Sequence, residues 1–181
     1  MIISTLKRMA WALLLLLIQV LVLDQVHPGG YGAPLICSLV IITLPMGTSR
    51  SAALLWGFGT GLIADIFAGT AGISSAALTF IAFIQPPLLE VMAPRDSEEE
   101  LSPSFSTMGR WNYLQFIAFL LLLHHVIYFA LEGFSYFHIE DIAISMGVSY
   151  AASLLLIILV ENVRNPKSKS RYGGELRTGK A

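Results

Sequence analysis

Asp65 is the residue whose type and surroundings point most directly to chemistry. It lies near the end of the apolar stretch LLWGFGTGLIADIFAG, residues 54–69. A charged side chain within a membrane is costly, so an acid at such a position faces protein and is a candidate for an ion or ligand site. The alternative is a structural carboxylate that accepts hydrogen bonds from a neighbouring helix end or a loop amide. The sequence leaves both interpretations open.

A second polar group lies in LLLLHHVIYFALEGF, residues 120–134. His125, Tyr128 and Glu132 are spaced by three and four residues, so on a helix they share one face. Such a face can form a proton relay or a polar clamp between helices. His124 and His125 point about 100° apart on a helix and are a poor chelating pair. Because the one cysteine, Cys37, lies in another stretch, we expect no metal site.

Sequence motifs that would indicate an enzyme are missing. The chain has no GxSxG or Ser-His-Asp arrangement, no HExxH motif and no glycine-rich loop that could cradle a phosphate. We therefore expect no catalytic residues and no cofactor, and nothing in the chain predicts a nucleic-acid partner.

The composition indicates which elements must position these residues. Of 181 residues, 55% are hydrophobic and 13% charged, and the mean hydropathy is +0.71, whereas about a quarter of a soluble protein is charged. The sequence predicts an all-α integral membrane bundle of six transmembrane helices, at about 9–26, 33–46, 52–68, 72–92, 113–133 and 141–160. The second segment is the weakest, because it is shorter than the roughly 20 residues that cross a bilayer.

The basic residues predict the orientation of the bundle. If all six segments cross and the N-terminus is cytoplasmic, all eleven Lys and Arg residues fall in the cytoplasm and the outer loops carry none. Cytoplasmic loops of membrane proteins are enriched in Lys and Arg. We therefore expect a multi-pass protein of the bacterial inner membrane with both termini in the cytoplasm.

Small residues form a row on the third segment. Residues four apart lie on one side of a helix, and this row consists of Ala53, Gly57, Gly61, Asp65 and Gly69. Close backbone approach through small residues is a main source of helix association in lipid. The row therefore predicts a surface that packs against another helix of the bundle or against a partner.

Acidic residues gather at the predicted outer end. They are Asp24, Asp65, Glu132, Glu140 and Asp141. Solvated helix ends and a functional site are both compatible with this clustering.

Two polar regions lie outside the six-helix domain, which covers residues 1–163. The cytoplasmic loop at about 93–112 is acidic and rich in Ser and Pro, so we expect it to be mobile. The tail, 164–181, is basic and flexible in composition, which suits an orientation signal that contacts anionic lipids. Just before the loop, Pro86 and Pro87 are expected to break or kink the fourth segment.

Parts of the sequence resemble the rod shape-determining protein MreD, in its Bacteroidetes-type form. The resemblance covers most of the chain, and its most specific part is the GF-x-x-GL-x-x-D core (Gly57, Phe58, Gly61, Leu62 and Asp65), followed by the HH-x-x-x-x-x-LE segment that starts at His124. Two positions depart from the pattern. Gln85-Pro86 stands where a basic residue followed by proline is expected, and Ser74-Ser75 stands where a histidine often occurs.

The resemblance implies a non-enzymatic inner-membrane component of the cell-elongation machinery, which supports peptidoglycan synthesis and cell shape. The implied partners are an MreC-like protein, the actin-like MreB, and RodA with its transpeptidase partner; a homodimer is also possible. The family is similar in fold to the substrate-binding components of energy-coupling-factor transporters. This similarity implies an alternative function, a membrane subunit that binds or transports a vitamin-like small molecule, and polar pocket residues at the outer end would favour it.

Overall fold

The computed structural model describes residues 2–26, 32–70, 72–93, 102–133 and 139–164. Its elements in these ranges are all helical, as the sequence predicts, and no strand occurs there. They are α1 (Ile2–Leu21), the 3-10 turn η1 (Leu23–Gln25), α2 (Ser38–Ile42), α3 (Arg50–Ala68), α4 (Ile73–Met92), α5 (Arg110–Glu132) and α6 (Ile139–Arg164).

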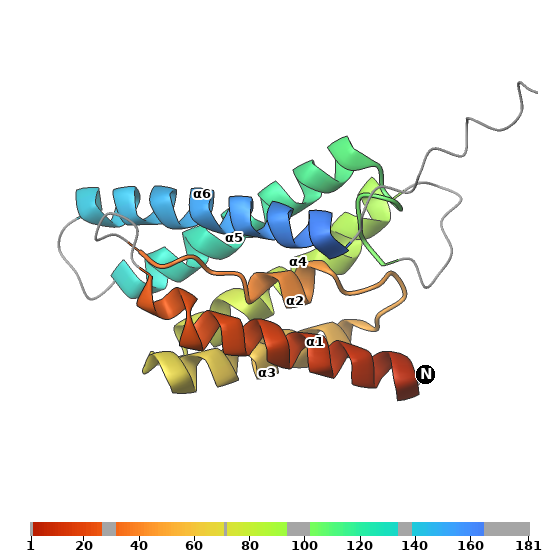
Figure 1. Cartoon of the computed structure of the whole chain (residues 1–181), viewed down its shortest axis with the longest axis horizontal. Helices are drawn as coiled ribbons and strands as arrows, with labels where there is room; N and C mark the ends of the chain where they lie inside the picture. The colour runs from red at the N-terminus through yellow and green to blue at the C-terminus, as the bar shows by residue number, and fades with distance from the viewer. Residues whose placement is uncertain (1, 27–31, 71, 94–101, 134–138, 165–181) are drawn as a thin grey trace, which may run out of the picture.

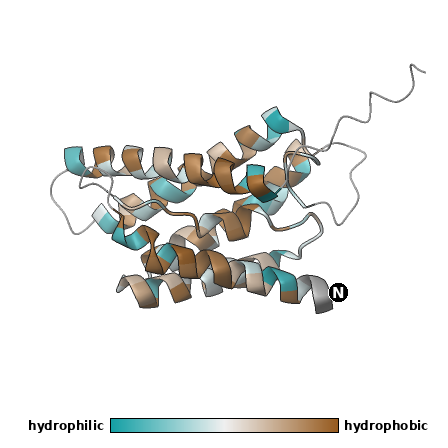
Figure 2. Cartoon of the chain, in the orientation of Figure 1, coloured by the Kyte–Doolittle hydropathy of each residue, from teal (hydrophilic) through white to brown (hydrophobic). Residues whose placement is uncertain are grey.

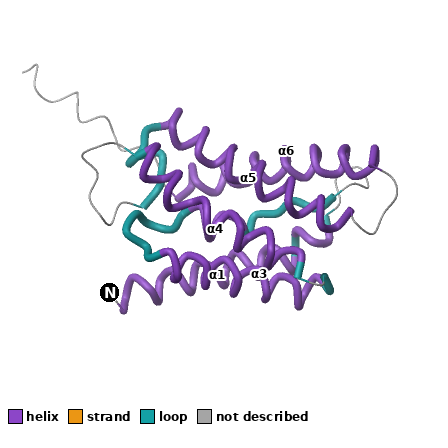
Figure 3. The backbone as a smooth tube through the Cα atoms, turned by 180° about the vertical axis from the view of Figure 1, so that it is seen from behind, coloured by secondary structure: helices purple, strands orange, loops and turns teal. Residues whose placement is uncertain are grey.

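The long helices run along a common direction in two groups (Figure 1). Helices α1 and α3 lie side by side, α5 and α6 form the other group, and α4 crosses between them, as the view from behind also shows (Figure 3). Helix α4 packs against both α3 and α5. It is therefore the element that joins the two groups.

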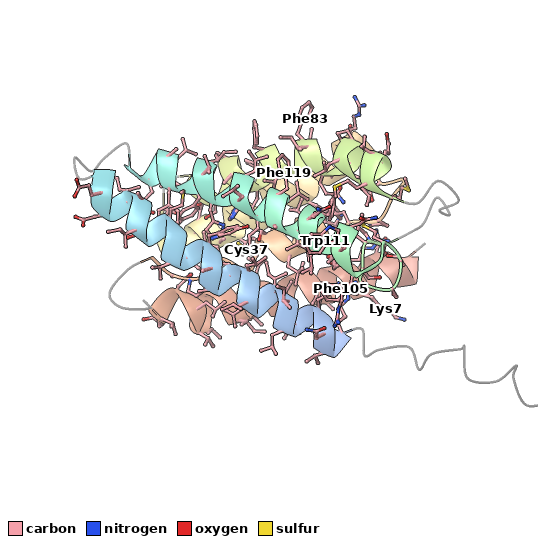
Figure 4. All side chains as sticks on the ribbon, turned by 90° about the horizontal axis from the view of Figure 1, so that it is seen from above. Lys7, Cys37, Phe83, Phe105, Trp111 and Phe119 are labelled. Carbon is pink, nitrogen blue, oxygen red and sulfur yellow. The ribbon has the colours of Figure 1, made fainter. Side chains whose placement is uncertain are left out.

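Five helices are long and apolar enough to cross a membrane. Their middle parts are mainly hydrophobic, whereas polar residues concentrate toward their ends (Figure 2). Large apolar side chains such as Phe83 and Phe119, which are 59% and 50% exposed, project from the bundle surface (Figure 4). These features are consistent with a multi-pass membrane protein whose surface faces lipid.

Within the described residues the structure has five such helices, where we expected six. The segment predicted at 33–46, called the central segment below, contains only the five-residue helix α2. Residues 34–42 are all buried, and the segment passes through the interior of the bundle (Figure 1). Its apolar run therefore reflects burial inside the protein and not a regular spanning helix.

Charge divides the bundle into two ends. At the basic end lie the starts of α1, α3 and α5 and the end of α6, with Lys7, Arg50, Arg110 and Arg164. At the acidic end lie the ends of α1, α3 and α5 and the starts of α4 and α6. No Lys or Arg occurs at the acidic end within the described ranges.

Two local expectations need correction. Helix α4 does not break at Pro86 and Pro87 but continues to Met92. Part of the predicted loop packs on the bundle, where Ser104 and Thr107 hydrogen-bond each other and Met108 is 3% exposed. Helix α5 begins within the predicted loop, at Arg110, and α6 extends to Arg164. The tail from 165 and the loop residues 94–101 lie outside the described residues.

Candidate functional site

The row of small residues on α3 packs against α4. Ala53, Gly57 and Gly61 are buried. A Cβ atom placed on Gly57 would lie 2.7 Å from the Leu78 carbonyl oxygen, and one placed on Gly61 would lie 2.6 Å from the Ser75 nitrogen. At Gly57 and Gly61 the surface is therefore in close contact with α4 of the same chain.

Gly69 does not belong to this row. Helix α3 ends at Ala68, and Gly69 caps it with a positive φ of 68°. A glycine in this left-handed conformation is a common helix end, because other residues adopt it at a cost. Gly69 is exposed, and a Cβ placed on it would meet no atom within 4 Å.

The Asp65 carboxylate binds the N-terminus of α4. Oδ1 accepts hydrogen bonds from the Thr70 hydroxyl (2.6 Å) and the Ser74 backbone N–H (2.8 Å). Oδ2 accepts from the Ser75 backbone N–H (2.9 Å) and from the Ser75 hydroxyl. The first N–H groups of a helix have no partner inside the helix and carry partial positive charge. Asp65 therefore caps α4 from a neighbouring helix.

This arrangement decides between the two interpretations of Asp65. A carboxylate has about four lone-pair positions, and the four hydrogen bonds from Thr70, Ser74 and Ser75 occupy them. The side chain is 4% exposed. The geometry supports the structural interpretation and leaves no acceptor position for an ion or ligand. The serine pair at 74–75 supplies three of the four donors.

Polar side chains from two helices, α1 and α6, hold the first part of the central segment. The Gln19 side chain donates to the Pro34 carbonyl oxygen (2.9 Å) and accepts from the Ile36 N–H (2.8 Å). The Ser149 hydroxyl donates to the Ala33 carbonyl oxygen, and the Ser153 hydroxyl accepts from the Leu35 N–H at 2.7 Å. Non-helical backbone is tolerated at membrane depth only where protein or water satisfies it. These side chains satisfy it here.

The two adjacent histidines have different surroundings, although both are fully buried. The His125 Nδ1 lies 2.8 Å from the Leu121 carbonyl oxygen, and its Nε2 lies 3.2 Å from the Ser153 hydroxyl. A carbonyl oxygen only accepts, so Nδ1 carries the proton in this bond. Neither ring nitrogen of His124 has a hydrogen-bond partner among the described residues.

The predicted face of His125, Tyr128 and Glu132 is divided between two places. His125 bonds to Ser153 of α6 and supports the central segment, whereas Tyr128 and Glu132 line a cavity at the acidic end. No hydrogen bond joins the three residues within the described part of the chain. The geometry is that of a polar clamp at His125, and it provides no continuous proton relay.

The cavity has a volume of about 620 Å³ and lies among the ends of six segments. Its carboxylates are Asp24 of η1, Glu132 of α5 and Asp141 of α6. Aromatic rings of Phe67, Tyr128 and Phe129 also face it, and its other lining residues are Val20, Gln25, Gly32, Ala33, Leu35, Ala68, Thr70, Gly133, Ile142 and Ser145. This volume is within the range of about 300–1,000 Å³ that holds small molecules. The sequence indicated the acidic cluster but not the cavity.

The basic end contains a buried carboxylate that sequence reasoning missed. The Glu161 side chain has no exposed surface, and its Oε2 lies 3.6 Å from Arg164 Nη1. The Arg164 guanidinium also lies 5.7 Å from the centre of the Trp11 ring. The spacing of three between Glu161 and Arg164 was the available signal, because such residues are neighbours on a helix surface.

No family model, curated protein or solved structure gives a significant match to this chain. The geometry of the bundle and the resemblance in the sequence are therefore the grounds for proposing a function.

Proposed function

We propose that this chain is a non-enzymatic membrane component of the bacterial cell-elongation machinery, as its resemblance to the MreD family implies. In this proposal it lies in the inner membrane with both termini in the cytoplasm. The chain crosses six times, five times as a long helix and once as the central segment. Its role is to assemble with an MreC-like protein, MreB, and RodA with its transpeptidase partner in support of peptidoglycan synthesis.

The observation that carries this proposal is an apolar groove between α3 and α4. The GF-x-x-GL-x-x-D core divides between two sides of α3: Gly57, Gly61 and Asp65 face α4, whereas Phe58 and Leu62 are 51% and 42% exposed. The exposed pair lines a groove of about 640 Å³, together with Leu54, Gly72, Ser75, Ala76, Thr79, Phe80 and Phe83. The residues that carry the resemblance thus form a helix–helix contact with α4 on one side of α3 and a lipid-facing groove on the other.

The groove suits a single membrane helix of a partner. Its lining is almost entirely apolar, and the Thr79 hydroxyl is already bonded to the Ser75 carbonyl oxygen at 2.6 Å. A helix in lipid gains its association energy mainly from van der Waals packing, and the rings of Phe58, Phe80 and Phe83 provide a large contact area. An MreC-like protein with one membrane helix is the occupant that the resemblance implies.

The test compares two phenylalanines of nearly equal exposure. Phe58 lies in the groove, whereas Phe119 of α5 is 50% exposed and lies outside it. We expect Phe58→Ala to weaken recovery of the MreC-like partner in mild detergent by about tenfold, the typical cost of truncating a central aromatic contact, and to round the cells. Phe119→Ala should retain the partner. Equal recovery with both variants, at equal protein levels, would exclude the groove as the partner site.

A second candidate is a membrane subunit that binds a vitamin-like small molecule. The observation that favours it is the cavity at the acidic end, with its carboxylates and aromatic rings. Apolar pockets with a few polar groups are the usual form of small-molecule sites. Co-purification with an ATPase pair in place of the cell-wall proteins would support this candidate over the first.

A further inference from the structure

The described walls of the cavity at the acidic end carry charge of one sign. Asp24, Glu132 and Asp141 reach it from η1, α5 and α6, and its described lining contains no Lys, Arg or His. Glu132 makes no hydrogen bond or ion pair with any described residue. The Oδ1 atom of Asp24 accepts from Gln19 Nε2 at 2.6 Å, while Oδ2 has no such partner in the same ranges. Carboxylate oxygens therefore remain available to a ligand.

We propose that this cavity binds a small aliphatic amine, and this inference rests on the second candidate function. An ammonium group is attracted by carboxylates in a site of low dielectric constant, where their charge is less screened than in water. The rings of Phe67, Tyr128 and Phe129 add faces on which a cation is stabilised and an apolar surface for the carbon chain of the ligand.

The arrangement of the carboxylates distinguishes an organic cation from a metal ion. A bound metal needs several ligands at about 2.0–2.6 Å from one point. Within the described residues, no group of three or more His, Cys, Asp or Glu side chains could hold a metal ion. Carboxylates on separate walls of a cavity of about 620 Å³ suit amino groups that are separated by a carbon chain.

The ammonium group can come from a free amine or from the headgroup of an aminophospholipid, since the cavity lies where the helices end. Both sources present the same chemistry to Glu132 and Asp141. A lipid also brings a phosphate, which these carboxylates would repel, so the free amine fits the site better. Bilayers of different composition separate the two sources.

The experiment measures binding by calorimetry to the full chain in nanodiscs of phosphatidylglycerol, with empty nanodiscs as the baseline. Three probes of equal length are compared: 1,5-diaminopentane, neutral 1,5-pentanediol and the anion glutarate. We expect only the diamine to bind. Adding phosphatidylethanolamine to the nanodiscs should leave this binding unchanged if the ligand is a free amine and should compete with it if the lipid headgroup is the natural occupant.

Variants connect the binding to the cavity. Glu132→Gln keeps the size of the side chain and should weaken diamine binding about tenfold or more, the cost of losing a hydrogen bond to a charged group. Asp141→Asn should weaken it severalfold because Asp141 is more exposed. Glu90→Gln is the matched control, since it removes the same charge from an exposed site at the basic end. Unfolding midpoints without ligand verify that each variant is folded.

Different failures have different meanings. If both Glu132→Gln and Asp141→Asn leave diamine binding unchanged, the diamine associates with the surface and not with the cavity. This result would overturn the amine inference. Binding of pentanediol or glutarate instead, abolished by Ala68→Trp at the cavity wall, would overturn the inference while the second candidate survives. If none of the three probes binds, the amine inference fails, and the second candidate is then decided by the co-purification with an ATPase pair.

Discussion

The two ends of the bundle accommodate their carboxylates in opposite ways. At the basic end, the Glu161 side chain is fully buried 3.6 Å from Arg164, and the Arg164 guanidinium lies against the Trp11 ring. At the acidic end, Glu132 and Asp141 line a cavity of about 620 Å³ whose described lining has no basic residue.

The carboxylates at the two ends of the bundle differ in whether their arrangement favours the stability of the fold or the binding of a ligand. A carboxylate in the interior is tolerated when its lost hydration is compensated, for example by an opposite charge, and Arg164 provides this charge at the basic end. Carboxylates that share a cavity without a cation repel one another and lower stability. Proteins retain such local conflicts mainly at functional sites. The comparison therefore supports a stabilising role for the basic end and a binding role for the acidic end.

The largest effect is expected from Gly61→Leu, which would push α3 away from α4 and so displace the helix that carries Phe67 and Ala68 of the cavity wall. The added side chain would meet the backbone of Ser74 and Ser75, which cannot rotate away. We expect a loss of about 3 kcal/mol in unfolding free energy, at the upper part of the usual range for overpacking, together with loss of diamine binding. Thermal unfolding in nanodiscs measures the first effect and calorimetry the second.

Gly59→Leu is the matched control for this prediction. A Cβ on Gly59 meets no atom within 4 Å, so its unfolding free energy should change by no more than about 0.5 kcal/mol, as for most surface substitutions. Equal stability of the two leucine variants would contradict the close packing of α3 on α4.

Substitution of Asp65 should have the next largest effect, because this carboxylate fixes the start of α4 and also holds Thr70, which lines the cavity. Asp65→Leu removes all acceptors from the start of α4, and we expect a loss of about 2 kcal/mol in unfolding free energy, within the range for unsatisfied buried donors. Asp65→Asn keeps one acceptor oxygen but directs an NH₂ group at N–H and O–H donors, so an intermediate loss is expected. The unfolding midpoints should follow the order Asp, Asn, Leu; an Asn variant as unstable as the Leu variant would show that charge, and not the cap, is essential.

Glu161→Ala should destabilise the basic end without affecting the acidic end. We expect a loss of about 1–3 kcal/mol, because Arg164 would lose its buried partner. Diamine affinity should remain unchanged, since Glu161 lies at the opposite end of the bundle. Glu90→Ala, at an exposed position, is the comparison for stability. If Glu161→Ala weakened diamine binding, the two ends could not be treated as independent.

The smallest effect concerns salt. Raising NaCl from about 50 to about 500 mM should weaken diamine binding roughly threefold, because partly exposed charges are screened. The stability contribution of the pair of Glu161 and Arg164 should change less, because the Glu161 side chain has no exposed surface and buried charges are screened less. Calorimetry and thermal unfolding at both salt concentrations provide the comparison.

Residues with a strong local signal were the predictable part of the fold. Five apolar segments of about membrane length became α1, α3, α4, α5 and α6, and the spacing of Gly57, Gly61 and Asp65 predicted their common face. The break that Pro86 and Pro87 allowed for did not occur, because α4 continues through them to Met92. The sequence also predicted a helix at 33–46, because burial in protein and burial in lipid produce the same apolar pattern.

The cavity and the buried Glu161 were not predictable in the same way. Both depend on contacts between helices that are distant in the chain, such as Asp24 with Glu132 and Asp141 around one space. Sequence spacing relates only residues on one helix. It therefore placed His125, Tyr128 and Glu132 on one face but did not reveal that His125 supports the central segment, whereas the other two line the cavity.

The central segment has a consequence for how this protein is made. Its backbone groups at Ala33 and Leu35 are satisfied by Ser149 and Ser153, which are synthesised more than a hundred residues later. Unsatisfied backbone groups are not tolerated in hydrocarbon, and the segment is too short to insert as a helix of its own. During translation the central segment must therefore remain outside the lipid, or bound to a chaperone, until α6 has been synthesised. A nascent chain that stops before Ser149 should leave this segment open to proteases, and completion of α6 should close it.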